Sequence, residues 1–122
     1  FNRYGPGEAY GRHVDNALRS EAPGGARMRT DLSATLFLGN CDSYDGGELV
    51  IHEGGMTSAH KLPAGSLLVY PASTIHEVRP VTRGDRLACV FWIQSLIRDA
   101  AARALLAELD SAIRSLSARG VG

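Results

Sequence analysis

Hydrophobic and polar residues alternate in short runs along most of the first 94 positions. Such alternation is typical of half-buried strands, whose successive side chains point to opposite faces. In residues 31–38, the leucines and Ala34 share one face and Asp31, Ser33 and Thr35 share the other, so we expect the polar face to meet solvent. Further strands are predicted at 47–53, 66–71, 74–81 and 86–94, and residues 1–12 form a turn that leads into a short strand. Turn-forming residues fill 20–26, 40–47, 54–55 and 82–85.

The last quarter of the chain changes to a helical period. Leu105, Leu109, Ile113 and Leu116 recur at helical spacing, among alanines that favour helix. With Ser95 as a candidate N-cap, the pattern predicts a helix over 95–119 that covers the strand-rich part. Five to seven short strands at this spacing suggest a sandwich or barrel rather than alternating strands and helices. We therefore expect one domain over residues 1–122.

Composition narrows the class of protein. The 122 residues are 44% hydrophobic, which suits one core, and 13 Lys+Arg balance 13 Asp+Glu, which argues against a nucleic acid partner. No apolar run approaches the ~18 residues of a membrane span, and the N-terminus does not resemble a signal peptide. Cys41 and Cys89 form no disulfide framework, so a cytoplasmic protein is expected. Because the chain begins at Phe1 rather than Met, we expect segments of a longer protein before it.

His13 and Asp15 are the first candidates for chemistry. On a strand, residues two apart point to the same face, so this imidazole and this carboxylate could bind one cation, although the pair alone is more simply a surface pair. His76, in a predicted strand after a proline turn, adds a second imidazole; its alternative is a core histidine bonded to a backbone carbonyl. Two histidines and one carboxylate are the ligand set of non-haem Fe(II) oxygenases.

Arg86 begins the last predicted strand. Ala88, Val90 and Trp92 share its face, and a guanidinium on so apolar a strand is costly to bury without an anionic partner. A carboxylate held by two parallel hydrogen bonds would supply that partner. Taken alone, Arg86 would more simply lie in solvent at the edge of the strand.

Four other residues are interpreted as structural. His52 and His60 lie beside turns and have no carboxylate two residues away, so both are placed on the surface. Cys89 is expected to be buried packing. Trp92 could wall a pocket on the Arg86 face, but filling of the core is the simpler role.

Together these residues form an H-x-D…H…R pattern, and with it the chain resembles the Fe(II)/2-oxoglutarate-dependent dioxygenases. It is most similar to the bacterial PKHD-type hydroxylases, which are related to prolyl and lysyl hydroxylases. The resemblance covers nearly the whole chain, through FNRYGPGEAYGRHVDNALR, MRTDLSATLFL, SYDGGELVI, KLPAGSLLVYPASTIHEVRPVTRGDR and FWIQSLIRD.

The resemblance implies a mainly β fold, the double-stranded β-helix, a cupin-like distorted jelly roll, over residues 1–94, with the helix at 95–119 after it. It implies that His13, Asp15 and His76 ligate Fe(II) and that Arg86 binds the distal carboxylate of 2-oxoglutarate. Tyr4 and Tyr10 lie near places where tyrosines of related prolyl hydroxylases line the cosubstrate or substrate pocket, which makes Tyr4 a candidate for that role.

The implied activity is hydroxylation of an unactivated C–H bond with O₂ and 2-oxoglutarate, which is decarboxylated to succinate; L-ascorbate binding is a further expectation. The substrate is a small molecule or a peptide. Apolar surface that upstream segments would normally cover should leave the chain prone to homo-oligomerise, or less stable than the full protein. The alternatives are a metal-dependent cupin enzyme that does not use 2-oxoglutarate, and a non-catalytic barrel that binds a small molecule.

Overall fold

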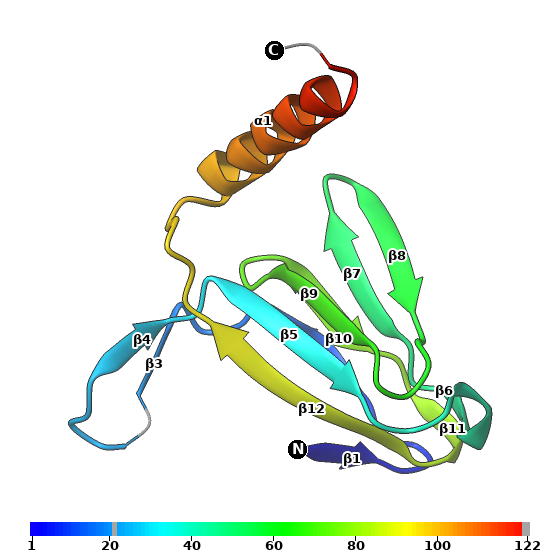
Figure 1. Cartoon of the computed structure of the whole chain (residues 1–122). Helices are drawn as coiled ribbons and strands as arrows, with labels where there is room; N and C mark the ends of the chain where they lie inside the picture. Colours follow the sequence, from blue (N-terminus) through cyan, green and yellow to red (C-terminus); the bar gives the residue numbers. More distant parts are fainter. Residues whose placement is uncertain (21, 121–122) are drawn as a thin grey trace.

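Two four-stranded antiparallel sheets form the body of the computed structural model, which describes residues 1–20 and 22–120 (Figure 1). The first sheet has the order β1 (Asn2–Tyr4), β12 (Arg86–Ile93), β5 (Leu32–Phe37), β9 (Leu67–Pro71). The second has the order β2 (Tyr10–His13), β10 (Ile75–Val78), β7 (Leu49–Glu53), β8 (Met56–His60). Neighbouring strands are mostly distant in sequence, as in the predicted jelly roll, and the fold class is confirmed.

Two small two-stranded sheets and a turn of helix extend the two main sheets. β6 (Tyr44–Gly46) pairs with β11 (Val81–Gly84), and a 3₁₀ turn over Cys41–Ser43 precedes them. β3 (Leu18–Ser20) pairs with β4 (Arg27–Arg29) and projects from one end of the first sheet (Figure 1). The described residues thus contain twelve strands rather than five to seven. The added strands are short and rich in glycine and polar residues, so their sequence is that of turns.

The hydrophobic core lies between the two main sheets. Phe37, Leu49, Ile51 and Tyr70 form its buried cluster, with Leu68 and Val78 among the residues packed against it. Phe37 and Tyr70 come from the first sheet, whereas Leu49 and Ile51 come from the second. Burial of these side chains holds the sheets together and leaves a pocket beside the cluster.

The two faces of β5 are the reverse of those predicted. Ser33 and Thr35, expected in solvent, are 0% and 2% exposed and face the inside with Phe37. The apolar face lies on the outer side of the sheet, where Leu32 and Leu36 are half-buried and Ala34 is 0% exposed. Strand parity was correct, but the inside of this barrel is partly a polar cavity, so hydrophobicity alone assigned the wrong face.

Apolar side chains are exposed on the outer face of the first sheet. Leu67, Val69, Leu87 and Phe91 alternate with the inward-facing residues of β9 and β12, and Phe1 is 97% exposed. The expected apolar surface is therefore present. Self-association or reduced stability caused by it stays a prediction.

Helix α1 (Ala100–Ala118) does not cover the barrel. It stands beyond the end of the sheets in Figure 1, and none of its described residues is buried. Its N-cap is Asp99, whose side chain accepts a hydrogen bond from the Ala102 amide at 2.8 Å, rather than Ser95. Residues 95–99 form a connection instead of the first helical turn. The helix that the structure describes is not long and apolar enough to cross a membrane.

Candidate active site

The pairing of β2 with β10 brings two histidines together. His13, the last residue of β2, lies opposite His76 of β10, and their ring centroids are 4.2 Å apart. His76 is 4% exposed, whereas His13 is half-buried at the edge of the pocket. Antiparallel register thus places both imidazoles on adjacent strands of one sheet.

Asp15 joins the histidines from beyond the end of β2. Its backbone amide donates to the Ala72 carbonyl at 3.2 Å, which fixes the segment after the strand. Asp15 Oδ1 lies 3.7 Å from His13 Nε2, and Oδ2 lies 3.6 Å from His76 Nε2. One ligand atom from each residue lies within 4.8 Å of the others. The predicted trio therefore converges, although Asp15 is placed by a loop rather than by the strand parity from which it was inferred.

Each imidazole is oriented by a backbone carbonyl. His13 Nδ1 is 2.8 Å from the Gly11 carbonyl oxygen, and His76 Nδ1 is 2.9 Å from that of Thr74. A carbonyl only accepts, so Nδ1 carries a proton in both rings, and in the neutral form of each ring the lone pair is on Nε2. This arrangement is found around metal-binding histidines. The alternative of a core histidine would explain the bond from His76 to the Thr74 carbonyl, but not the approach of its Nε2 to Asp15.

Two side chains hold the Asp15 carboxylate in place. Ser33 Oγ and Trp92 Nε1 both donate to Oδ2, the latter at 3.1 Å. Trp92 therefore lines the pocket beside a charged group, and the simpler core-filling interpretation was wrong. Ser33 was missed because it was assigned to the outer face of β5; a serine amid a buried strand was the available signal. With Oδ2 occupied, Oδ1 is the oxygen left to bind a cation.

The donor set fits a divalent transition metal. Two imidazoles and one carboxylate, each with a hydrogen-bonded partner behind it, supply three ligands on one side of a cation. The other side faces a pocket of about 200 Å³, which leaves room for further ligands. The residues present therefore fit the Fe(II) that the sequence suggested.

Arg86 lies in the same pocket and is almost fully buried. It is 1% exposed, so the alternative of an arginine in solvent is wrong. Its Nε donates to the Gly47 carbonyl at 2.9 Å, and no described carboxylate lies within 4.0 Å of it. Burial lowers the pKa of Arg86, as expected for a cation removed from water without a counterion. The guanidinium thus fits the carboxylate of a ligand.

Tyrosines surround this guanidinium. The ring of Tyr4 lies 5.9 Å from the Arg86 carbon Cζ, and Tyr70 lines the same pocket. Burial raises the pKa of Tyr70, which keeps its phenol protonated, and its hydroxyl is 3.3 Å from Thr35 Oγ1. Burial also raises the pKa of Tyr4. These hydroxyls are neutral donors, so a carboxylate at Arg86 would meet hydrogen-bond donors rather than a second anion.

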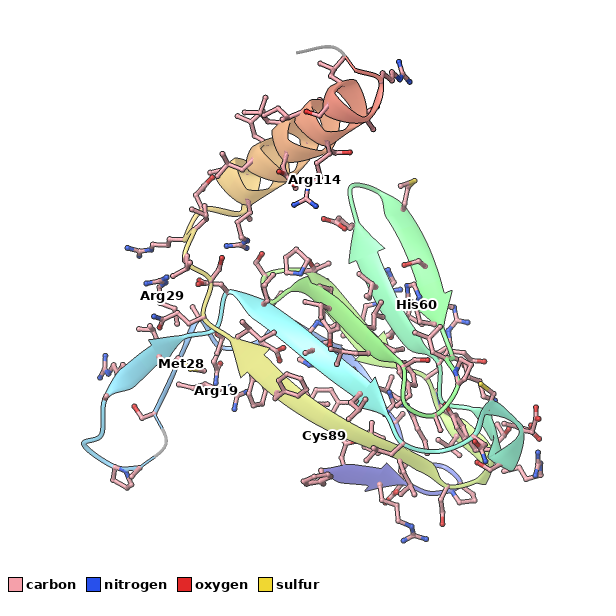
Figure 2. All side chains as sticks on the ribbon, viewed as in Figure 1. Arg19, Met28, Arg29, His60, Cys89 and Arg114 are labelled. Carbon is pink, nitrogen blue, oxygen red and sulfur yellow. The ribbon has the colours of Figure 1, made fainter. Side chains whose placement is uncertain are left out.

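The remaining candidates lie outside the pocket or at its rim. Tyr10 lines it and packs edge-on against His13, with ring centroids 4.2 Å apart. His52 is half-buried on the second sheet, 3.1 Å from a Glu77 oxygen, and His60 contacts Ser58 on β8 (Figure 2). Neither contributes to the trio. Cys89 is half-buried on the outer face of β12 (Figure 2) rather than fully buried.

Comparison with known proteins assigns the family. Residues 1–94, the part that holds both sheets and the trio, match the 2OG-Fe(II) oxygenase superfamily. The chain belongs to this family. The two histidines, the carboxylate and the buried arginine are thus found in a fold that binds iron and 2-oxoglutarate in related proteins.

Within the family, the chain is similar to PKHD-type hydroxylases. It is 59% identical over 119 residues to one from Xanthomonas axonopodis pv. citri, with 96% of this chain and 52% of the relative covered. A PKHD-type hydroxylase from Gluconacetobacter diazotrophicus is 55% identical over 119 residues, with 98% and 52% covered. The chain therefore spans about half the length of the curated relatives it matches.

Solved structures support the same fold. A prolyl-4-hydroxylase from Pseudomonas putida is 31% identical with a TM-score of 0.60, over 76% of this chain and 49% of that one. A 2OG-Fe(II) oxygenase family oxidoreductase from Burkholderia pseudomallei is 26% identical with a TM-score of 0.60, over 74% and 39%.

Replacement of Gly47 by alanine should disturb the Arg86 pocket. Gly47 has φ +68°, and an added Cβ would lie 3.1 Å from Arg86 Cδ and 3.0 Å from Val81 Cγ2. Gly54→Ala is a matched control, since Gly54 has φ +57° but no atom within 4 Å of the added Cβ. Both variants bear the left-handed backbone penalty, and only Gly47→Ala adds overpacking of about 1–3 kcal/mol. Urea unfolding should show that difference; equal losses of stability would contradict the tight contact.

Proposed function

We propose that the protein is an Fe(II)- and 2-oxoglutarate-dependent dioxygenase that hydroxylates an unactivated C–H bond. The observation that carries the proposal is the presence, in one pocket, of a His–Asp–His trio and a buried guanidinium without a carboxylate partner. When bound, iron, 2-oxoglutarate and O₂ supply the oxidising chemistry, in which one oxygen atom enters the substrate and the other enters succinate as CO₂ leaves.

Each pocket residue has a role in this proposal. Nε2 of His13 and of His76, with Oδ1 of Asp15, would hold the metal. Ser33 and Trp92 keep the carboxylate oriented, and the two backbone carbonyls keep the imidazoles in the correct tautomer. Because these supporting groups are already in place, binding a metal needs little rearrangement.

The other end of the pocket would bind the cosubstrate. Arg86 would take its distal carboxylate through parallel hydrogen bonds, with Tyr4 and Tyr70 beside it. A desolvated pairing of this kind restores much of the solvation that the buried guanidinium lost. The proposed reaction needs no further general base, because the cofactors supply the oxidising chemistry.

Each of the two alternatives leaves one part of the pocket unexplained. A cupin enzyme that does not use 2-oxoglutarate has no use for a buried guanidinium beside the metal. A non-catalytic barrel has no use for three oriented metal ligands. The combination therefore favours the dioxygenase, and the binding of metal and of 2-oxoglutarate can be tested separately.

The substrate in this proposal is a small molecule or a peptide, with no nucleic acid or membrane partner. The balanced charge supports the exclusion of nucleic acid, and the two free cysteines fit the reducing cytoplasm. A role for L-ascorbate is supported by the resemblance to PKHD-type hydroxylases. Homo-oligomerisation is supported by the exposed apolar side chains on the outer face of the first sheet.

Loss of one trio residue should abolish metal binding. Removal of a residue behind a ligand already costs 10–100-fold in affinity, so His76→Ala and Asp15→Ala should each weaken anaerobic Fe(II) binding by more than about 100-fold. Competition with a chromogenic chelator measures this directly. His60→Ala, which removes an imidazole outside the pocket, is the control. Unchanged affinity in His76→Ala would rule out the assigned site.

Replacement of Arg86 should separate cosubstrate binding from metal binding. In Arg86→Ala the 2-oxoglutarate concentration for half-maximal succinate formation should rise at least ~10-fold, the scale of one charged hydrogen bond, with Fe(II) affinity near that of the wild type. Arg86→Lys keeps the charge but loses the fork, and should lie between the two. Arg83→Ala removes an exposed arginine paired with Asp45 and should behave as wild type. Overlapping curves for Arg86→Ala and wild type would rule out Arg86 as the residue that binds the cosubstrate, and a wild-type chain that forms no succinate would favour the metal cupin alternative.

A further inference from the structure

A second arginine, Arg19, borders the same pocket at its other end. It lies on β3, and its guanidinium carbon is 3.5 Å from the centroid of the Trp92 ring. The nitrogen of that ring donates to Asp15 Oδ2 at 3.1 Å. One indole ring therefore separates the Arg19 guanidinium from a residue of the metal trio, and Figure 2 shows Arg19 where β3 meets the end of β12.

The Arg19 guanidinium is buried on one side, where its Nε has no hydrogen-bond acceptor among the described residues. Its Nε is inaccessible to solvent and, among residues 1–20 and 22–120, has no hydrogen-bond partner. No described carboxylate lies within 4.0 Å of the group. Stacking on Trp92 uses only the face of the planar cation and leaves its in-plane N–H groups free.

Neighbouring arginines show that the fold otherwise satisfies such groups. Arg29, on the partner strand β4, pairs with Asp31 and donates to the Ser95 carbonyl at 2.8 Å. Arg103 donates to the carbonyls of Ile97 and Arg98. Arg19 differs from both because its side chain lines the pocket and its Nε has no partner among the described residues.

Arg19 and Arg86 reach the pocket from different elements. Arg86 begins β12, with the Tyr4 ring beside it, whereas Arg19 lies on β3 and stacks on Trp92. The Trp92 nitrogen donates to Asp15, so the Arg19 guanidinium borders the trio. The proposed function assigns Arg86 to the distal carboxylate of the cosubstrate, which leaves Arg19 for a different anion.

From this geometry we propose that Arg19 and Trp92 form a second anion subsite, which binds a compact oxyanion on the substrate to be hydroxylated. The proposal rests on the proposed function and adds a substrate class: an acid whose carboxylate or phosphate is held beside the metal trio. A free or C-terminal carboxylate satisfies this requirement, and the uncharged interior of a peptide does not. Guanidinium binds carboxylate and phosphate by the same forked donors, so both sources need to be compared.

The test uses three small probes that each carry a methyl group. The full chain is loaded with Zn(II) and saturating 2-oxoglutarate at fixed ionic strength, then titrated with N-acetylglycine, methyl phosphate or the neutral N-acetylglycinamide. Binding is followed by saturation-transfer NMR on the methyl group. The fluorescence emission of Trp92, the one tryptophan of the chain, is a second measure of binding, because Arg19 stacks on its ring. Neither readout depends on catalysis.

The wild-type chain should bind at least one oxyanion probe about tenfold more tightly than the amide, the scale of one charged hydrogen bond. The anionic probe that binds more tightly shows whether the substrate group is a carboxylate or a phosphate. Arg19→Gln should remove the preference and Arg19→Lys should keep part of it. Arg27→Gln, which removes an exposed arginine from the same hairpin, should leave it unchanged.

Equal binding of acid and amide by the wild type would overturn the subsite, and this comparison needs no variant. A loss of more than about fivefold in 2-oxoglutarate affinity in Arg19→Gln would also overturn it, since Arg19 would then belong to the cosubstrate site. Failure of the proposed function looks different, because Zn(II) or 2-oxoglutarate itself would then not bind the wild-type chain.

Discussion

The burial of one positive charge constrains the whole barrel. Arg86 is 1% exposed, and no described carboxylate neutralises it. Such an arrangement is costly unless a ligand brings the anion. The surroundings agree with that requirement: the Gly47 carbonyl takes one N–H, protonated tyrosines face the group, and the absence of a Cβ at Gly47 leaves space for the arginine stem. Without such an anion, the buried guanidinium costs the fold part of its stability.

The metal trio depends on a different kind of constraint, the register between two strands. Pairing of His13 with His76 fixes the two imidazoles, and a loop anchored at Ala72 adds Asp15. Donors from the opposite sheet, Ser33 and Trp92, then orient the carboxylate. Both sheets thus contribute to one site, so the packing of the core and the geometry of the site cannot vary independently.

From the sequence it was possible to predict which four residues share the pocket and where most of the longer strands lie. The H-x-D, the later histidine and the arginine at the start of β12 were identified from residue type and position, because few side chains can bind a metal or a dicarboxylate. The sequence was insufficient to predict which face of a strand points inward and what the helix packs against, because tertiary structure determines both. The inward face of β5 carries Ser33 and Thr35 because the interior is a polar pocket, which alternation cannot reveal. The helix begins at Ala100 after an Asp99 cap rather than at Ser95, and none of its described residues is buried, because amphipathic spacing does not specify a partner.

In the proposed function, one pocket holds a divalent metal on the trio and a dicarboxylate on Arg86. The most direct measurement is a crystal structure of the chain with Mn(II), which does not support turnover, and 2-oxoglutarate. We expect the metal on His13, Asp15 and His76, and the distal carboxylate within hydrogen-bonding distance of both terminal nitrogens of Arg86. A metal bound elsewhere, or a 2-oxoglutarate whose distal carboxylate does not contact Arg86, would contradict the claim.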